Sequence, residues 1–263
     1  MSYIIYCFIK FSLWIHRILK SSFSGKTEFV NDAYGQDLAN YNFEVVRDYT
    51  ADYQVVAPSH EIKNLNILEI GTGKSLGVAA LLAIRGNHVV TLDRFKHVEE
   101  PCEELEDFCS REQVKFEQVA KNQFLVGSGS VTYFVCPLES RVSAFKEKFD
   151  LVLSRATLEH IENVGTCLQN LYFYSKKGAR HVHEIDHRDH GLFSHFKFCS
   201  NMWFHNIPSE VWEKVVIQIP GLPNKINSEK YRELFRNFGF LEEAYKLKFP
   251  NEESVSIHSL YKE

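Results

Sequence analysis

Short apolar runs alternate with amphipathic segments through the central part of the chain. Apolar runs too short for helices predict strands at residues 66–70, 88–92, 131–136, 149–153 and 180–185. Longer apolar or amphipathic segments predict helices at residues 76–84, 101–109 and 157–175. A helix at 228–237 and strands at 241–249 and 254–261 follow. Because alternating strands and helices favour parallel pairing with right-handed crossovers, we expect an α/β, doubly wound, Rossmann-like fold with a mostly parallel seven-stranded sheet.

Residues 1–60 are expected to form an N-terminal amphipathic helix and a helical cap. The apolar stretch at residues 3–20 is interrupted by Lys10, His16 and Arg17, which leaves it too short to span a membrane. On a helical wheel the basic residues share one side, and the large apolar residues lie mostly opposite. Such a helix can make a peripheral contact with an anionic membrane surface, or it can dock on the domain as a cap. We favour the docked cap.

Charge and cysteine content argue against some classes of function. The net charge is −4 and there is no long basic run, which disfavours a nucleic-acid partner. The six cysteines are scattered without a C-x-x-C pair, as expected for reduced thiols in a cytoplasmic protein. The apolar N-terminal stretch also lacks the basic start and the cleavage site of a signal peptide. The sequence does not determine the oligomeric state.

The turn after the first predicted strand carries the strongest indication of a ligand. The strand contains Glu69, and Gly71 and Gly73 let the backbone turn tightly and approach a ligand. Asp93 ends the second strand twenty residues past Gly73, where a carboxylate can accept both hydroxyls of a ribose. A P-loop is excluded because Leu68 occupies the position of its first glycine. A dinucleotide fingerprint fits less well, because its third glycine comes one residue too late, so an NAD-linked oxidoreductase is the weaker alternative.

This turn, with an acidic residue after the second strand, resembles the cofactor motif of class I methyltransferases, which use S-adenosylmethionine (SAM). Residues 149–160 resemble the fourth-strand region of the same superfamily, and Lys176-Lys177-Gly178 resembles the turn before its fifth strand. The resemblance spans residues 65–189 and implies a SAM-dependent methyltransferase whose methyltransferase domain is residues 61–263. The cofactor-binding residues that it implies are Glu69, Gly71, Thr72, Gly73, Asp93, Arg94, Glu139 and Ser154. A non-catalytic scaffold with the same fold is the second alternative.

Three segments resemble a group of bacterial methyltransferases associated with polysaccharide biosynthesis. They are Ser154–His160, His183–Gly191 and Pro223-Asn224-Lys225. His187 stands where that group usually has an apolar residue, and Lys225 replaces an arginine. The resemblance implies an acceptor that is a small molecule or a glycan intermediate, methylated on a hydroxyl. The absence of a D-P-P-Y or N-P-P-Y sequence after the fourth strand argues against methylation of nucleic-acid amino groups.

The acceptor is expected beyond the carboxyl ends of the strands. Candidate catalytic residues there are His160, Asp186, His187, Asp189 and His190. Three interpretations remain open: a histidine general base oriented by a carboxylate, a divalent metal held by two aspartates and a histidine, or a structural network in which Arg188 pairs with a carboxylate. We favour the base and assign no metal ligands. A similar Leu-Glu-His segment in ubiquinone-biosynthesis O-methyltransferases has a metal-site glutamate where this chain has Ala156.

Residues 191–227 form an aromatic-rich insertion after the fifth predicted strand. Its largest rings belong to Phe193, Phe196, Phe198, Trp203, Phe204 and Trp212. Insertions at this place can form part of an acceptor pocket, since aromatic rings stack on sugar faces. The alternative is a small accessory core beneath a long loop. The sequence leaves both open.

Overall fold

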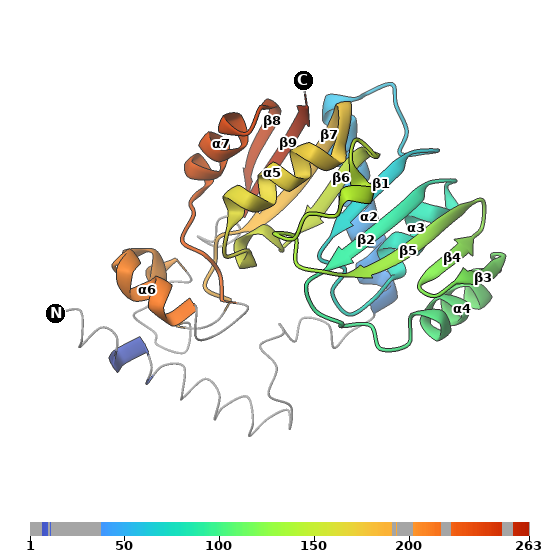
Figure 1. Cartoon of the computed structure of the whole chain (residues 1–263), viewed down its shortest axis with the longest axis horizontal. Coiled ribbons are helices and arrows are strands. Elements are labelled where there is room, and N and C mark those ends of the chain that lie inside the picture. The colour runs from blue at the N-terminus through green and yellow to red at the C-terminus, as the bar shows by residue number, and fades with distance from the viewer. Residues whose placement is uncertain are drawn as a thin grey trace.

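The computed structural model of the chain describes residues 7–9, 11, 38–190, 193, 202–216, 222–248 and 255–262. For residues 214–216, 248 and 255–262 only the backbone is described. Within these ranges nine strands form one sheet, in the order β3-β4-β5-β2-β1-β6-β7-β9-β8 (Figure 1). The strands are β1 (Asn66–Ile70), β2 (His88–Asp93), β3 (Phe116–Ala120), β4 (Gln123–Val126), β5 (Gly129–Val135), β6 (Phe149–Arg155), β7 (Ser175–Asp186), β8 (Phe240–Lys248) and β9 (Val255–Lys262).

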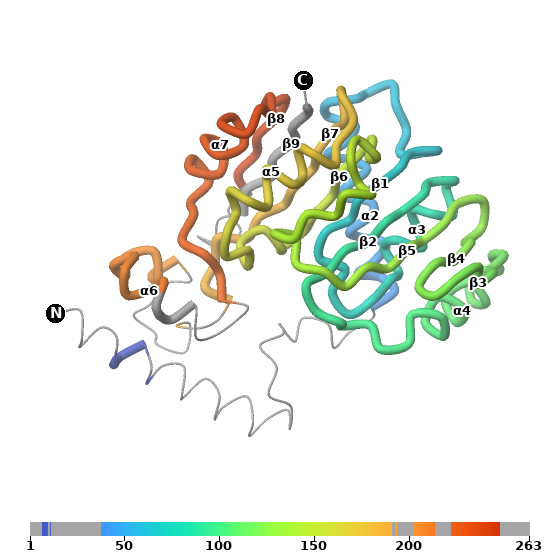
Figure 2. The backbone as a smooth tube through the Cα atoms, in the orientation of Figure 1, coloured from blue at the N-terminus to red at the C-terminus, as the bar shows by residue number. Residues whose placement is uncertain are grey.

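Helices cover both faces of the sheet (Figures 1 and 2). The α-helices are α2 (Leu38–Val56), α3 (Gly77–Ile84), α4 (Pro101–Arg111), α5 (Val164–Tyr174), α6 (Ser209–Val216) and α7 (Ser228–Asn237). Three short 3-10 helices are η2 (Ser143–Phe145), η3 (Leu158–His160) and η4 (Trp203–Asn206). The helices α2, α3 and α4 pack on one face of the sheet, and α5 and α7 pack on the other.

The middle of the sheet confirms the predicted doubly wound architecture. Five adjacent strands, β5, β2, β1, β6 and β7, pair in parallel. Successive residues along a strand serve opposite faces, as in β6, where Leu151 and Leu153 join one core and Val152 joins the other. Because both faces are covered, the parallel strands are nearly continuous apolar runs, which is why they could be predicted from the sequence.

All seven predicted strands are present, and two more, β3 and β4, form an antiparallel hairpin at the edge of the sheet. The sequence did not predict this hairpin because β3 is almost fully exposed and carries no apolar run. The turn predicted at Lys177-Gly178 is a bulge inside β7, since Phe149 pairs with Ser175 and Leu151 with Arg180.

The single helix predicted at residues 157–175 is wrong in one respect, because η3 and a break precede α5. Asn163 ends the break, where its side chain accepts a hydrogen bond from the backbone amide of Thr166 at 2.9 Å. That bond caps the first turn of α5 and sets where the helix begins.

The helical cap is described in part. In α2 the residues Asn42, Val45, Val46, Tyr49 and Tyr53 are buried, at the spacing of one helix face. From the predicted helix at residues 3–20, only residues 7–9 and 11 lie within the described residues. Of these, Ile9 is fully buried and Phe8 contacts the ring of Trp203, which supports the docked cap. No helix within the described ranges is both long enough and apolar enough to cross a membrane.

The described part of the insertion forms a small aromatic core. Phe193, Phe204 and Trp212 are buried against one another, and Trp203 packs on Phe193. These buried rings are not available for stacking on an acceptor, so they match the accessory-core alternative. Phe196 and Phe198 lie outside the described residues.

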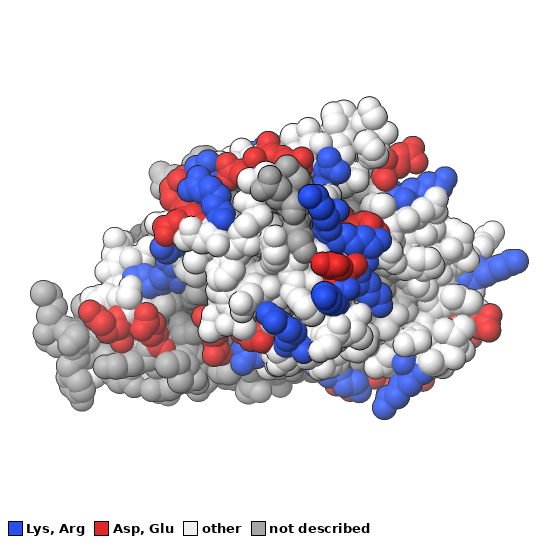
Figure 3. All heavy atoms as spheres, turned by 45° about the horizontal axis from the view of Figure 1, so that its top comes forward, with Lys and Arg blue, Asp and Glu red and all other residues white. Residues whose placement is uncertain are grey.

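Charged residues of both signs are mixed on the face shown in Figure 3. Ion pairs among the described residues include Lys176 with Asp150 at 2.8 Å and Arg232 with Glu242 at 2.8 Å.

Candidate functional site

The carboxyl ends of β1, β2, β6 and β7 meet at one edge of the sheet because these strands are parallel. At the end of β2, Asp93 is only 8% exposed. Its two carboxylate oxygens accept hydrogen bonds from the backbone amides of Gly73, at 3.1 Å, and Phe95, at 3.0 Å. The predicted proximity of Asp93 to the glycine turn is therefore confirmed. Since a carboxylate can accept about four hydrogen bonds, both oxygens can still accept a ligand hydroxyl.

The two glycines of the turn are required for different reasons. Both adopt positive φ, +80° at Gly71 and +64° at Gly73, which favours glycine. A Cβ at Gly71 would lie 2.0 Å from the hydroxyl oxygen of Thr157, so the turn packs tightly against the segment that follows β6. A Cβ at Gly73 would meet no atom within 4 Å, so the space above Gly73 is open. Between them, the hydroxyl of Thr72 hydrogen-bonds that of Thr91.

Glu69 is a buried carboxylate beneath this turn, only 4% exposed. Its Oε2 atom has no hydrogen-bond partner among the described residues. Burial, opposed by a hydrogen bond from Thr91 and aided by the charge of Asp93, raises the pKa of Glu69 to about 8. An unpaired carboxylate in such a place is stabilised by a cationic group nearby.

The remaining predicted cofactor residues lie at the same edge, and two of them, Arg94 and Ser154, have side-chain partners in the protein. Arg94 forms an ion pair with Glu162 at 3.2 Å. Glu139 follows β5, and its Oε2 atom is buried without a hydrogen-bond partner in the described part of the chain. Ser154 is fully buried, and its hydroxyl lies 2.7 Å from Nδ1 of His183.

Ser154 begins a buried chain of side chains on the α5 and α7 face. His183 continues it to His181 through a nitrogen–nitrogen contact of 3.3 Å, and His181 reaches the hydroxyl of Ser175 at 2.8 Å. His183 also stacks on Phe235 of α7, with ring centroids 5.4 Å apart. Part of the histidine-rich region therefore satisfies polar groups inside the core.

Asp186 and Asp189 are bonded to groups other than a histidine. Asp186 takes two hydrogen bonds from Nε of Arg188, one from Nη2 at 2.6 Å and one from its backbone amide. Burial alone would raise the pKa of Asp186, but the hydrogen bonds from Arg188, together with the charges of His190 and Arg188, hold the pKa below its usual value. Asp189 accepts the backbone amide of Phe193 at 2.8 Å. This arrangement agrees with the network interpretation for the two aspartates and does not show either of them orienting His190.

His187 is also buried in this network. Its backbone carbonyl lies 3.1 Å from Nε2 of His205, and its ring packs at a tilt on Tyr231. Burial, together with the nearby His205, lowers the pKa of His187 to about 4. The ring of His187 is therefore uncharged at neutral pH.

The other two candidates, His160 and His190, surround Glu159; we call these three residues the Glu159 cluster. Glu159 is 1% exposed, and each histidine Nε2 lies 3.9 Å from its Oε1 atom. Within the described ranges, neither oxygen of Glu159 nor Nε2 of His190 has a partner in hydrogen-bonding geometry. Burial raises the pKa of Glu159 well above its usual value, and the backbone amides of Glu159 and Asp186 oppose this increase. Sequence reasoning found both histidines and left Glu159 out of the site.

The Pro223-Asn224-Lys225 segment fixes the position of this cluster. The amide of Asn224 donates to the carbonyl of Glu159 at 2.5 Å. Its side-chain amide donates to the carbonyls of Leu158 and Ile161, at 3.0 and 3.2 Å. Lys225 donates to the carbonyl of Ile207, which ties the segment to the insertion. The three segments picked out in the sequence therefore converge on one place.

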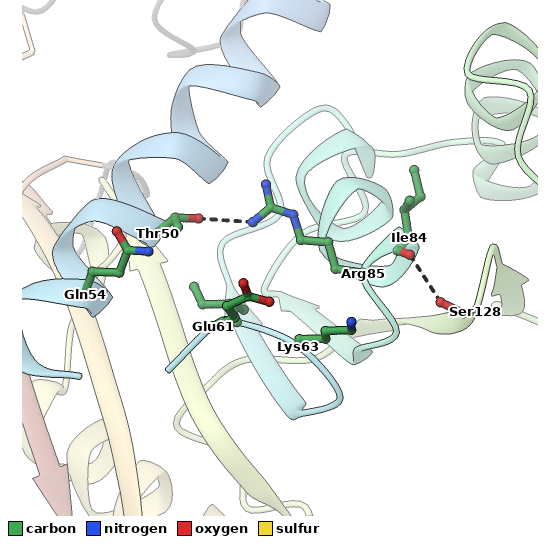
Figure 4. Close-up of a pocket in the computed structure, with 8 residues that line it drawn as sticks. Thr50, Gln54, Glu61, Lys63, Ile84, Arg85 and Ser128 are labelled. Carbon is green, nitrogen blue, oxygen red and sulfur yellow. Dashed lines mark hydrogen bonds between the residues drawn. The ribbon is translucent and has the colours of Figure 1, made fainter. Parts of the chain in front are cut away.

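Two hollows in the described part of the molecule lie elsewhere. One, of about 530 Å³, is lined by Thr50, Gln54, Glu61, Lys63, Arg85 and neighbouring residues (Figure 4). The other, of about 960 Å³, runs between α2 and the end of α3. The first hollow lies at the amino ends of the strands, because its residues 61–63 and 128 directly precede β1 and β5. It is therefore separate from the ligand edge of the sheet.

Known proteins share this architecture. A family model described as a methyltransferase domain matches residues 38–241. Among solved structures, magnesium protoporphyrin IX methyltransferase from Synechocystis PCC 6803 with bound SAH is 16% identical, with 96% of this chain and 100% of that chain covered and a TM-score of 0.54. The PH0226 protein from Pyrococcus horikoshii OT3 is 15% identical, with 88% and 94% covered and a TM-score of 0.56.

A SAM-dependent methyltransferase from Mesorhizobium loti is 13% identical, with 82% of this chain and 100% of that chain covered and a TM-score of 0.52. At such identities these structures are similar in fold. No curated protein matches the chain.

Proposed function

Since the chain belongs to the methyltransferase domain family, we propose that it transfers a methyl group from SAM to a hydroxyl of a small molecule or glycan intermediate. It is a SAM-dependent methyltransferase, which sets aside the NAD-linked alternative. The observation that carries the cofactor assignment is the contact of Asp93 with the Gly71–Gly73 turn, at 3.1 Å from the Gly73 amide.

The residues at the edge of the sheet fit SAM. Asp93 has oxygens free to accept the ribose hydroxyls, and the open space above Gly73 admits the cofactor over the turn. The unpartnered oxygen of Glu69 suits the cationic amino group of the methionine moiety. When bound, SAM supplies a methyl group already activated by the positive charge on its sulfur. The chain has to align the acceptor with that methyl group and provide for the proton of the acceptor.

The proposal of a hydroxyl acceptor is based on the Glu159 cluster. It lies beyond β6 and β7, at the same edge as the cofactor residues. In the transfer, the acceptor oxygen bonds to the methyl carbon while the sulfur–methyl bond breaks, and its electron pair stays on sulfur. The hydroxyl proton passes to Nε2 of His190, which has no hydrogen-bond partner in the described part of the chain. The carboxylate of Glu159 and the ring nitrogen of His190 offer unpartnered acceptor atoms for that hydroxyl, whereas a neutral amine would not need them.

Radiolabelled methyl transfer tests this function. The purified chain is incubated with methyl-labelled SAM and separate panels of hydroxyl-bearing glycans and of amines. We expect label in products from the hydroxyl panel and stoichiometric formation of S-adenosylhomocysteine. Label confined to the amine panel would contradict the proposed acceptor. Binding of SAM without turnover across both panels would favour the scaffold alternative.

The variant His190→Ala separates acceptor chemistry from cofactor binding. Calorimetry should give an unchanged dissociation constant for SAM, because His190 lies on the acceptor side. Turnover should fall by about 10²- to 10⁴-fold, the range typical for loss of a group that handles a proton. Exposed His60 offers a control, since His60→Ala should change neither quantity.

A further inference from the structure

We propose that Glu159, His160 and His190 bind one divalent transition-metal ion, such as Zn²⁺. The three side chains each offer a ligand atom, and these atoms all lie within 4.8 Å of one another. Two imidazole nitrogens and one carboxylate oxygen form a donor set that holds zinc in many catalytic sites. The proposal that an ion binds depends on this geometry, whereas the role of the ion in catalysis rests on the proposed function.

The surroundings of Glu159 favour a cation. The carboxylate is 1% exposed, and no donor among the described residues meets either oxygen in hydrogen-bonding geometry. Burying a carboxylate that accepts no hydrogen bond is unfavourable, because the charge loses its hydration. A divalent cation beside Oε1 would remove that penalty and use the lone pair on Nε2 of His190, which is also unpartnered in the described part of the chain.

To bind one ion, the three ligand atoms would have to move closer together. Each histidine Nε2 lies 3.9 Å from Oε1 of Glu159. In a tetrahedral site with metal–ligand bonds of about 2.0 Å, neighbouring donor atoms lie about 3.3 Å apart. Binding an ion would bring each of these nitrogens roughly 0.6 Å closer to Oε1. The two imidazole nitrogens, which lie within 4.8 Å of each other, would move closer together by up to about 1.5 Å.

The backbone that carries the cluster is fixed before any ion arrives. The side chain of Asn224 donates to the carbonyls of Leu158 and Ile161, which flank Glu159. The hydroxyl of Tyr231 also donates to the Leu158 carbonyl, at 3.0 Å. His190 adopts a φ of +53°, an uncommon conformation for a residue with a side chain. Strained residues of this kind concentrate at ligand sites, where the surrounding structure holds them.

Three protein ligands leave at least one position of a tetrahedral ion open. A hydroxyl that binds an open position is more acidic than a free one, because the cation stabilises its conjugate base. This suits a hydroxyl acceptor.

Cobalt substitution provides the test. Chelator-treated protein is titrated with Co²⁺, whose visible absorption reports tetrahedral coordination by nitrogen and oxygen, and then with Zn²⁺ in competition. We expect one Co²⁺ per chain, displaced by Zn²⁺. Glu159→Gln and His190→Asn should each weaken Co²⁺ binding by at least about 100-fold, since loss of a supporting residue alone costs 10- to 100-fold. His60→Ala should bind Co²⁺ as the unaltered chain does.

The variants are checked for SAM affinity by calorimetry, which reports an intact fold. Retained SAM binding with lost Co²⁺ binding supports the metal site. Unchanged Co²⁺ binding in both ligand variants, or no cobalt spectrum in the unaltered chain, overturns it. If Glu159→Gln fails to fold, His160→Asn gives the same decision. Failure of methyl transfer to every hydroxyl, with Co²⁺ still bound at the cluster, would refute the proposed function and leave the metal site standing.

Discussion

Gly71→Ala is expected to destabilise the chain mainly through one contact. The new Cβ would lie 2.0 Å from Oγ1, 2.8 Å from Cγ2 and 2.9 Å from Cβ of Thr157. Such overpacking costs about 1–3 kcal/mol, and an L-residue at a φ of +80° costs about 1–2 kcal/mol more. The unfolding free energy should therefore fall by roughly 2–5 kcal/mol.

Gly73→Ala is the matched control. Its φ of +64° gives the same backbone penalty, but its Cβ would meet no atom within 4 Å. Its unfolding free energy should fall by only about 1–2 kcal/mol. Because we propose that SAM occupies the space above Gly73, this variant should lose SAM affinity out of proportion to its small loss of stability.

Urea denaturation and calorimetry with SAM measure both quantities. Thr157→Ala removes two of the three close atoms and should restore part of the stability of Gly71→Ala in a double-mutant cycle. Equal destabilisation by the two glycine variants, or no rescue, would show that Thr157 does not restrict position 71. Unchanged SAM affinity in both would place the cofactor elsewhere.

Asp93→Asn should weaken SAM binding at least about 10-fold in calorimetry, because the amide turns one acceptor oxygen into a donor that faces backbone amides. Asn224→Ala should lower the unfolding free energy by about 1–3 kcal/mol in urea titrations, since the carbonyl of Ile161 loses its side-chain donor and that of Leu158 keeps only Tyr231. It should also lower turnover more than SAM affinity, and equal losses would refute its positioning role. Glu69 keeps its proton to about pH 8 when folded but only to about 4.5 when unfolded, so the SAM-free protein should lose stability as pH rises between those values. The slope relative to Glu69→Gln should approach about 1.4 kcal/mol per pH unit, and equal slopes would rule out the unpaired carboxylate.

The fold could be predicted because its central strands are buried on both faces. Runs such as residues 149–153 are then apolar at four of five positions, and the order of these runs along the chain indicates the topology. The hairpin β3–β4 could not be predicted in this way, since only alternate residues of β4 are buried and β3 is exposed. Residues at the end of a strand, such as Asp93, are placed by the strand itself.

The acceptor side was predicted less completely because pairing among side chains is a tertiary property. The sequence placed His160 and His190 near one edge, but it did not show that Asp186 is bonded to Arg188. Glu159 was left out because a carboxylate at a helix start is usually exposed to solvent, whereas Asn224, from 65 positions later in the chain, holds this segment inside the protein.

The chain of polar side chains on β6 and β7 also determines where its hydrogen atoms lie. The hydroxyl of Ser175 donates to the carbonyl of Leu171, so it must accept from Nε2 of His181. A neutral ring has one N–H, so Nδ1 of His181 accepts a hydrogen bond from Nε2 of His183. Nδ1 of His183 then carries no hydrogen and accepts a hydrogen bond from the hydroxyl of Ser154. One hydrogen bond to a carbonyl of α5 thus selects the tautomer of both imidazoles. Replacing Ser175 with alanine would remove this constraint on the two tautomers.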